Sequence, residues 1–388
     1  MLNINLKPKV TCLLCFMMLI LTGCWDRVEV NDVAIVTGTG VDKTGDGEME
    51  LSVQIIIPKA PSGGQGDKLS IVEQSTGKTI TDVNSKLQQK LSRKLFVGHN
   101  SVLFIGEKKA EEGIHDVLDV FARHPFERLR TYVFVTKDKP IDLLAVTPDL
   151  ERTSSEVARE LAKGKTGLSV TVKDVLQMLN AKGRSAALPI LKIDKGSQGS
   201  ANLSLSGTAI FNNGKLVGEI DDAMTRGVLW VRNEIETANV TVSPENGEGL
   251  ITFEILEADS KLIPIIDKGK WKLTVRTTSI DDVLENNSNL NIMNPEILKK
   301  LENQMQKDIE ERIQSALEYV QKDLKSDIFG FDEAFHRHYP DEWAKVEDNW
   351  EEKFSEIEVK VQSSVTIERP GRSTTPQGIP KDEVIGGK

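Results

Sequence analysis

The sequence predicts a multidomain protein of the α+β or mixed α/β class, with mixed and antiparallel sheets against which helices pack. Strand-like and helix-like patterns alternate through the first 200 residues, which is typical of an α/β layer arrangement. Beyond residue 200, alternating strand patterns and one long helix near 295–327 indicate an α+β region. The chain has 388 residues, of which 39% are hydrophobic and 28% charged, and its length leads us to expect two to three domains.

Residues 1–23 have the parts of a lipoprotein signal peptide in the right order. Lys7 and Lys9 form a basic start, and an almost wholly apolar run follows from Val10 to Leu21. This run of about a dozen residues is too short to span a bilayer, which needs about 20 residues, but it fits a signal peptide. It ends in Leu21-Thr22-Gly23-Cys24, a lipobox pattern. We therefore predict cleavage before Cys24 and lipidation of its thiol, which anchors the mature chain to a membrane.

Cysteine content and charge narrow the chemistry of the mature chain. Cys12 and Cys15 lie within the predicted signal, so Cys24 alone is retained, and it is acylated. The mature chain then has no internal disulfide, no thiol nucleophile and no cysteine metal site. Loss of the two signal lysines changes the net charge from −10 to −12, with 47 basic and 59 acidic residues left. Such an acidic body argues against nucleic-acid binding and against adsorption to anionic lipid by overall charge.

The N-terminal region, 24–200, is predicted to be α/β and can hold two subdomains. Residues 153–180 have a helical pattern, and we place a domain boundary near 200. Residues 181–201 are mostly linker-like, although 187–193 fits a short strand. The other predicted elements are strands at 33–42 and 48–57 joined by a turn, strands at 101–106 and 130–136, and helices at 80–94 and 114–121.

The C-terminal region, 201–369, is predicted to be an α+β domain. Asn213-Gly214 between two apolar runs predicts a hairpin turn. Apolar and polar residues alternate near 251–255, 271–275 and 357–367, as expected for half-buried strands. The tail at 370–388 is rich in Gly, Pro, Ser and Thr, so it is predicted to be disordered.

The strongest helical pattern of the chain begins at Asn294-Pro295, a capping residue followed by proline at the first helical position. Gly330 is expected to end this helix. One apolar stripe runs along the helix for about 30 residues. We expect this stripe to pack on the sheet of its own domain rather than on a partner. The stripe consists of Leu298, Leu301, Met305, Ile309, Ile313, Leu317, Val320 and Leu324.

No residue pattern predicts catalysis, a metal or a cofactor. His336 and His338 lie near Asp332 and Glu333, but an i, i+2 spacing on a helix points the two rings to different sides. Asp42–Gly47 is similar to the start of a calcium loop, yet its twelfth position is valine rather than glutamate, so a hairpin turn is predicted. The sequence contains no P-loop, no G-x-S-x-G and no dinucleotide-binding glycine motif followed by a helix.

A series of motifs runs in order along nearly the whole chain. It starts at Cys24-Trp25-Asp26-Arg27 and continues in Ala34-Ile35-Val36-Thr37-Gly38. The later motifs are Ser92-Arg93-Lys94-Leu95-Phe96, Gly98-His99, Ile105-Gly106-Glu107, 130–135, 207–211, 215–218, Thr225-Arg226-Gly227, Leu229-Trp230, 327–331, 335–340, Trp343 and the strand at 357–367. The series resembles the Ger(x)C family, the C subunits of spore germinant receptors. It departs at Ala223-Met224, where the family pattern has acidic residues.

The resemblance implies a function that composition and periodicity do not. It implies a non-catalytic, three-domain lipoprotein on the outer face of the spore inner membrane. It also implies two integral-membrane partners, an A and a B subunit, with which the protein senses nutrients and triggers germination. The resemblance does not say which nutrient is sensed or whether this subunit contacts it. Trp25, Asp26 and Arg27, beside the lipid, are candidates for contact with the membrane or with a membrane subunit.

Two other classes of protein compete with this interpretation. A solute-binding lipoprotein of a transporter would have two similar doubly wound lobes and a ligand cleft. An extracytoplasmic hydrolase would need a cluster of histidine or carboxylate groups with shifted pKa values. The motifs also have simple structural explanations: the glycines of Thr37–Gly40 can permit close packing of a strand, and Trp230 is expected to be a core residue.

Overall fold

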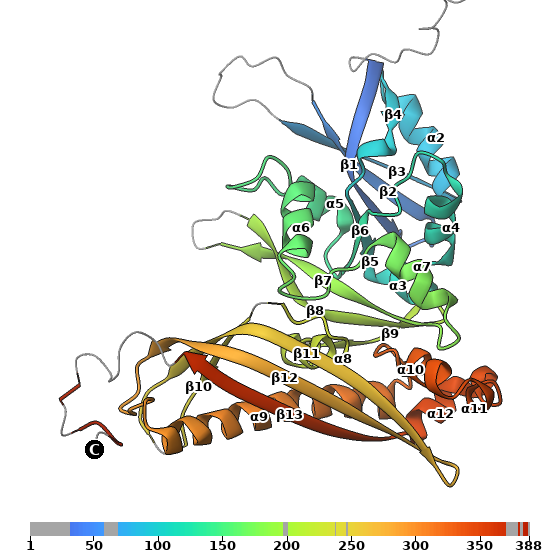
Figure 1. Ribbon diagram of the computed structural model, residues 1–388. Coiled ribbons are helices and arrows are strands. Elements are labelled where there is room, and N and C mark those ends of the chain that lie inside the picture. The colour runs from blue at the N-terminus through green and yellow to red at the C-terminus, as the bar shows by residue number, and fades with distance from the viewer. Residues whose placement is uncertain are drawn as a thin grey trace, which may run out of the picture.

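The computed structural model contains two sheets with packed helices, one sheet above the other in Figure 1. The predicted mixed α and β fold class is confirmed. The predicted signal peptide and Cys24, Trp25, Asp26 and Arg27 lie outside the described residues. Within the described part of the chain, no helix is long and apolar enough to cross a membrane. The structure describes residues 32–57, 69–196, 201–236, 238–245, 247–369, 379–380 and 383–386.

The first sheet has nine strands, with a parallel centre and antiparallel hairpins on both sides. Its strands are β1 (Val33–Lys43), β2 (Met49–Ile56), β3 (Ser70–Gly77), β4 (Lys94–Phe96), β5 (Val102–Gly106), β6 (Tyr132–Thr136), β7 (Ser185–Lys195), β8 (Ala201–Asn212) and β9 (Lys215–Ile220). The order is β3-β2-β1-β5-β6-β7-β8-β9, and β4 pairs with the start of β1. β1, β5, β6 and β7 are parallel neighbours. Parallel strands need helical crossovers, which is why this sheet is covered on both faces.

Helices cover both faces of the first sheet. They are α2 (Ile80–Lys90), α3 (Glu107–Glu112), α4 (His115–Arg123), α5 (Pro140–Ala145), α6 (Ser154–Lys163) and α7 (Val172–Asn180), with a 3-10 turn at Val97–His99. α5 and α6 share one core cluster with Val102 and Phe104 of β5. Leu103 and Ile105 of the same strand belong to the other cluster, with α2, α4 and α7. A strand buried on both faces is apolar at successive positions, which explains the continuous apolar pattern of β5.

The predicted close approach at Thr37–Gly40 is confirmed. A Cβ atom at Gly38 would overlap the Ser155 hydroxyl of α6, and one at Gly40 would lie 2.5 Å from the Cβ of Pro140 in α5. Glycine at these positions therefore lets α5 and α6 lie directly on β1.

Residues 181–201 are not a linker for most of their length. β7 occupies Ser185–Lys195 and pairs with β8 in an antiparallel hairpin. Ala186, Leu188 and Leu191 are fully buried, so the segment lacks the polar alternation that marks a half-exposed strand. The boundary predicted near 200 therefore falls inside a hairpin of one continuous sheet.

The second sheet has four strands and lies below the first in Figure 1. Its strands are β10 (Asn239–Val242), β11 (Ile251–Asp267), β12 (Lys270–Asn286) and β13 (Glu358–Arg369), in that order. β11 and β12 pair antiparallel as predicted, β10 adds antiparallel to β11 without having been predicted, and β13 joins β12 in parallel. The helices of this half are α8 (Asp222–Val231), α9 (Pro295–Leu317), α10 (Phe331–His338), α11 (Pro340–Trp343) and α12 (Trp350–Glu356), with a 3-10 turn at Glu347–Asn349. Trp230, at the end of α8, is buried in the core as predicted.

The long predicted helix is present but ends earlier than expected. Asn294 caps α9 and Pro295 is its first residue, as the sequence indicates. The helix packs its apolar stripe on β13 and α8, within its own half of the molecule. The α-helix stops at Leu317 and continues as a π-helix over Glu318–Asp323. Gly330 therefore does not end it; this residue has a φ of 82° and precedes α10. A left-handed glycine serves either end of a helix, and the sequence does not distinguish the two uses.

Part of the predicted disordered tail lies against the second half. Ile385 forms an isolated bridge with Leu290, and its carbonyl accepts a 2.9 Å hydrogen bond from the Asn291 N–H. The carbonyl of Gly386 accepts from the Asn291 side chain at 3.1 Å. The prediction of disorder does not hold for these residues near the start of α9.

Candidate functional site

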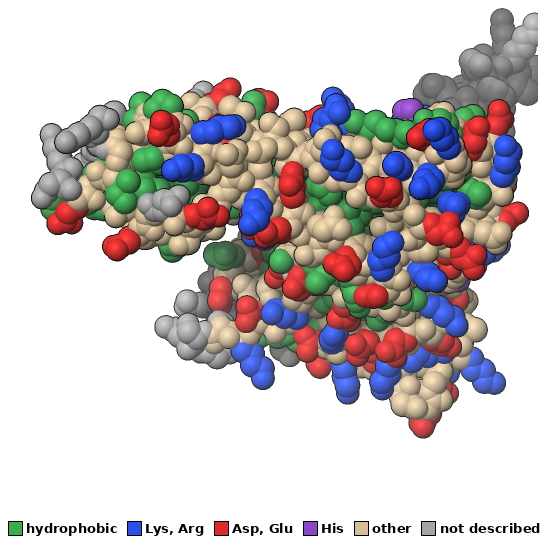
Figure 2. All heavy atoms as spheres, turned by 90° about the horizontal axis from the view of Figure 1, so that it is seen from below, with side chains coloured by type: hydrophobic (Ala, Val, Ile, Leu, Met, Phe, Trp, Pro, Cys, Tyr) green, Lys and Arg blue, Asp and Glu red, His purple; other side chains and the backbone are tan. Residues whose placement is uncertain are grey.

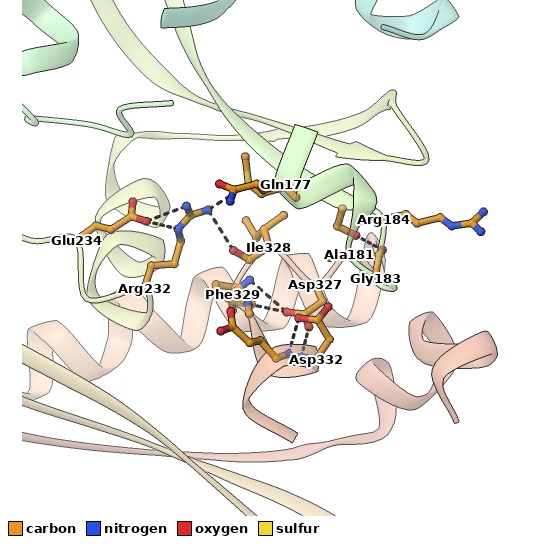
Figure 3. A pocket seen from close by; sticks show the side chains of 14 residues that line it. Gln177, Ala181, Gly183, Arg184, Arg232, Glu234, Asp327, Ile328, Phe329 and Asp332 are labelled. Atoms are coloured by element: carbon orange, nitrogen blue, oxygen red, sulfur yellow. Dashed lines mark hydrogen bonds and ion pairs between the residues drawn. The ribbon is translucent and has the colours of Figure 1, made fainter. Parts of the chain in front are cut away.

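A polar pocket lies where the first sheet meets the second half of the chain. The pocket is about 400 Å³ in volume and combines α7, the turn before β7, the end of α8 and the segment 327–333. Figure 3 shows Arg232 and Asp327 inside it, on segments far apart in the sequence. We call this site the junction pocket.

Asp327 is the centre of the junction pocket. Its Oδ1 accepts backbone N–H groups of Phe329, Gly330 and Phe331 at 3.1–3.2 Å. Its Oδ2 accepts the Asp332 N–H at 2.8 Å and the Trp350 indole N–H at 3.0 Å. Three of these donors come from the chain at the start of α10, where N–H groups lack helical partners. Asp327 therefore fixes the turn into α10 and ties α12 to it.

The same burial disfavours the charged forms of two neighbouring carboxylates, Asp327 and Asp332. Removal from water and the nearby Asp332 carboxylate raise the pKa of Asp327 to about 7, against the five N–H donors that favour its charged form. Burial also raises the pKa of Asp332, while the N–H groups of Glu333 and Gly183 oppose that shift. Gly183 belongs to the turn before β7, so Asp332 contacts the first half of the chain.

Arg232 is one of two arginines that line the junction pocket, with Arg184. Its Nε and Nη2 atoms each lie 2.8 Å from Glu234 Oε1. Its Nη1 donates to the carbonyl of Ile328 at 3.4 Å and lies 3.8 Å from the sulfur of Met178 in α7. One side chain thus joins α7, the end of α8 and the segment before α10.

An aromatic cluster lies behind the polar groups. Trp350 is edge-on to Trp271 at a ring distance of 6.2 Å, and Phe354 packs edge-on to Phe331 at 5.5 Å. Trp271 belongs to β12, so the cluster connects the hairpin of the second sheet to α10 and α12. Such aromatic pairs add to the free energy gained by burying the rings.

The polar groups of the pocket bind other parts of the chain and so act as a structural joint. Arg232 is paired with Glu234, Asp327 is bound by five N–H donors, and the Ser185 hydroxyl donates to the Gly183 carbonyl at 2.9 Å. Each of these groups is already engaged with another part of the chain. The arrangement holds the two halves of the molecule in register.

Of the residues weighed as possible metal ligands, Asp332 and Glu333 line the junction pocket, whereas His336 and His338 do not and have other partners. The His336 ring stacks on Trp343 at 4.3 Å, and His338 Nδ1 lies 2.9 Å from the Ala334 carbonyl. The Asp42–Gly47 segment is a hairpin turn, as predicted, and Asp42 Oδ1 accepts the Lys109 N–H at 3.2 Å. Asp42 therefore binds the start of α3.

The junction residues were not singled out as a site in the sequence. Asp327 was part of a family motif, and Arg232 was outside every motif. A local signal did exist for Asp327, because an aspartate shortly before a glycine and a new helix often accepts free N–H groups. No local signal predicts the contacts of Arg232 with Met178 and Ile328, which are 54 and 96 positions away.

Comparison with known families matches both halves of the chain. The family model "Spore germination protein N-terminal domain" matches residues 26–193. The model "Spore germination B3/GerAC like, C-terminal" matches residues 206–371. The two matches meet at the hairpin between β7 and β8.

Similar proteins extend over nearly the whole length. Spore germination protein KC of Bacillus subtilis is 27% identical, over 94% of this chain and 97% of that protein. Spore germination protein B3 of the same species is 27% identical, over 91% and 95%. GerQC of Bacillus cereus is 24% identical, over 90% and 96%. The crystal structure of the GerBC protein has the same fold, with a TM-score of 0.56 and 21% identity over 85% of this chain and 96% of that one.

Proposed function

Because this chain belongs to the GerAC family of spore germination proteins, we propose that it is a non-catalytic, lipid-anchored subunit of a nutrient germinant receptor. It acts together with two integral-membrane partners, the A and B subunits, at the outer face of the spore inner membrane. The observation that carries the proposal is the match of both halves of the chain, in order, to spore germination models.

The proposed anchor rests on the N-terminal sequence. A basic start, a short apolar run and the lipobox ending at Cys24 occur in the order that lipoprotein processing requires. One acyl chain binds membranes only marginally, and the diacylglyceryl group on the cysteine supplies two. Trp25, Asp26 and Arg27 would then lie at the membrane surface, where they can contact lipid or a membrane subunit.

The absence of catalysis is proposed from the state of the junction pocket. Asp327 and Arg232 in this pocket are bound to other parts of the chain, so they serve the fold. A solute-binding lipoprotein would have two similar lobes, whereas the two sheets here differ in strand number and strand direction. This difference favours the receptor subunit over the solute-binding alternative.

The test is nutrient-triggered release of dipicolinic acid from spores that lack other germinant receptors. Deletion of the protein should abolish release by nutrients and leave release by a receptor-independent trigger unchanged. Cys24→Ala should show the same defect, because the anchor is lost. Cys15→Ala is the matched control, since this cysteine lies in the predicted signal and is removed. A normal nutrient response in the deletion strain would overturn the assignment.

A further inference from the structure

An apolar pocket opens at the end of the molecule where the described chain begins. Its volume is about 850 Å³, and its lining includes Val33 and Ile35 of β1, Leu95 and Phe96 around β4, and Phe126 after α4. In Figure 1 this is the upper end, with the start of β1 beside α2 and β4 and the second sheet at the opposite end. The pocket is therefore far from the junction pocket.

The loop between α4 and β6 exposes two large apolar side chains at this end. Phe126 is 62% exposed and Leu129 is 42% exposed. A single exposed apolar residue is ordinary on a soluble protein. An exposed phenylalanine on the rim of an apolar pocket, with an exposed leucine three residues later, is a surface of the kind that contacts a membrane or a partner.

Two of the segments that form this end are basic although the chain as a whole is acidic and the exposed Asp32 precedes β1. Arg93 and Lys94 lie in a segment, 91–99, that contains no acid, and Arg128 and Arg130 flank Leu129. All four cations are exposed. The one acid of the loop is Glu127. Burial raises the pKa of Glu127 to about 7, so this side chain carries less than a full charge at neutral pH.

The face opposite this end does not share this character. On the face seen from below in Figure 2, acidic and basic side chains are interspersed. The full chain has a net charge of −10, so a run of cations with one acid is a local departure. Local positive charge beside exposed aromatic and aliphatic groups is the combination that binds anionic membranes.

The position of the predicted anchor favours a membrane over a partner protein as the surface that this end contacts. Cys24 lies nine residues before Val33, so an extended connection reaches at most about 32 Å. A lipid on Cys24 therefore holds the upper end of the molecule near the bilayer surface. The second sheet, at the opposite end in Figure 1, is farther from the bilayer.

We propose that the apolar pocket and the 124–130 loop form a membrane-facing patch that lies on the outer leaflet. Phe126 and Leu129 enter the interface, and Arg93, Lys94, Arg128 and Arg130 contact anionic headgroups. The lipid anchor then sets proximity, and the patch sets the orientation in which the body stands on the membrane. This inference rests on the anchoring part of the proposed function.

The test uses the mature chain from residue 24 onward, acylated at Cys24 and reconstituted in phosphatidylcholine vesicles with or without phosphatidylglycerol. Cys24 is acylated in the mature chain, so a cysteine introduced at Leu129→Cys is its single free thiol and takes an environment-sensitive fluorophore. The matched control is Ile265→Cys, a site 43% exposed in the second sheet. Circular dichroism checks that both labelled proteins are folded.

The label at 129 should shift to shorter emission wavelength on vesicles, be quenched by lipid-borne quenchers and lose its quenching by aqueous iodide. The label at 265 should stay accessible to iodide. Anionic lipid should strengthen the shift at 129, and Arg128→Gln with Arg130→Gln should remove that dependence. Identical iodide quenching at both sites, in protein that floats with the vesicles, would overturn the patch and leave the anchor intact.

Two other outcomes also overturn the proposal and are told apart. Protein that fails to float with vesicles would remove the anchor and the patch together. A label at 129 that stays aqueous on vesicles but is protected when the membrane subunits are co-reconstituted would assign the patch to a protein partner. The spore germination assay is independent of all three results, so failure of the patch is distinguishable from failure of the receptor role.

Discussion

The junction pocket and the membrane-facing patch place polar and apolar groups in opposite ways. In the junction pocket, Asp327 is buried and accepts five N–H donors. In the patch, Phe126 is exposed, and among the described residues Glu127 Oε2 is buried without a hydrogen-bond partner. Polar groups that are hydrogen-bonded within the chain stabilise the fold. Exposed apolar side chains and an unpaired polar atom are instead typical of a surface that binds a membrane or another molecule. The difference separates a structural joint from a surface for binding.

The largest expected effect comes from removing the central carboxylate of the junction. Asp327→Ala leaves five N–H groups without their acceptor, three of them in buried hydrogen bonds, and each buried unpaired donor is costly. We expect the free energy of unfolding to fall by at least about 3 kcal/mol. Urea denaturation followed by tryptophan fluorescence measures the change.

Asp323→Ala is the matched control, because this aspartate is exposed four residues earlier. It should change the free energy of unfolding by less than about 0.5 kcal/mol. Equal losses in the two variants would mean that the junction does not depend on Asp327, and the contrast between the two regions would fail.

Asp281 sharpens the comparison because it is buried like Asp327 but accepts far fewer hydrogen bonds. Its Oδ2 accepts one hydroxyl at 3.2 Å, and its Oδ1 has no partner among the described residues. Burial raises its pKa from 3.8 to about 6. The folded state therefore favours the protonated acid, and this contribution to stability is full below about pH 4 and lost as the pH rises through about 6.

Asp281→Asn should stabilise the protein at pH 7 by about 1–3 kcal/mol and flatten the pH dependence between pH 4 and 6. Thermal unfolding across this pH range measures both effects. Asp282→Asn, on the other face of the same strand, should leave the slope unchanged. A loss of stability in Asp281→Asn at pH 7 would show that the charged carboxylate has partners the described contacts do not reveal.

Local sequence patterns predicted the elements well where one physical rule controlled them. Period-two and period-3.6 patterns located β1, β2, α4 and the start of α9, and the Asn213-Gly214 turn joins β8 to β9 as predicted. β7 was mostly missed, since a strand buried on both faces has no alternation to detect. The end of α9 was misplaced, because a left-handed glycine such as Gly330 can precede a helix as well as end one, and the sequence does not distinguish the two uses.

The sites were less predictable than the elements. The junction pocket joins Arg232 to Ile328, 96 positions later, and nothing local fixes such a pairing. The patch had a local signal, in which basic residues alternate with apolar ones in the 124–130 loop, but its meaning depends on exposure. Cys24, Trp25, Asp26 and Arg27 lie outside the described residues, so they remain predictions from the sequence.

Arg232 offers a moderate test of the joint. Its side chain is 17% exposed and pairs with Glu234 while reaching the Ile328 carbonyl. Arg232→Met keeps the apolar stem and removes these contacts, so we expect a loss of about 1–2 kcal/mol in the free energy of unfolding. Arg159→Met, at a more exposed ion pair with Glu160, should cost less than about 1 kcal/mol. An equal effect of both would reduce Arg232 to a surface residue.

The smallest expected effect is the one that most directly defines the patch. Phe126→Ser should change the free energy of unfolding by less than about 0.5 kcal/mol, because its ring is mostly exposed and stabilises little in isolation. Phe121→Ser, five residues earlier in α4 and only 5% exposed, should cost about 3–5 kcal/mol by comparison. Urea denaturation of both variants measures the contrast. If Phe126→Ser costs as much as Phe121→Ser, then Phe126 belongs to the internal packing of the fold. Its exposure would then be no evidence for membrane contact. The junction pocket and the patch would differ in polarity, but both would serve to stabilise the fold.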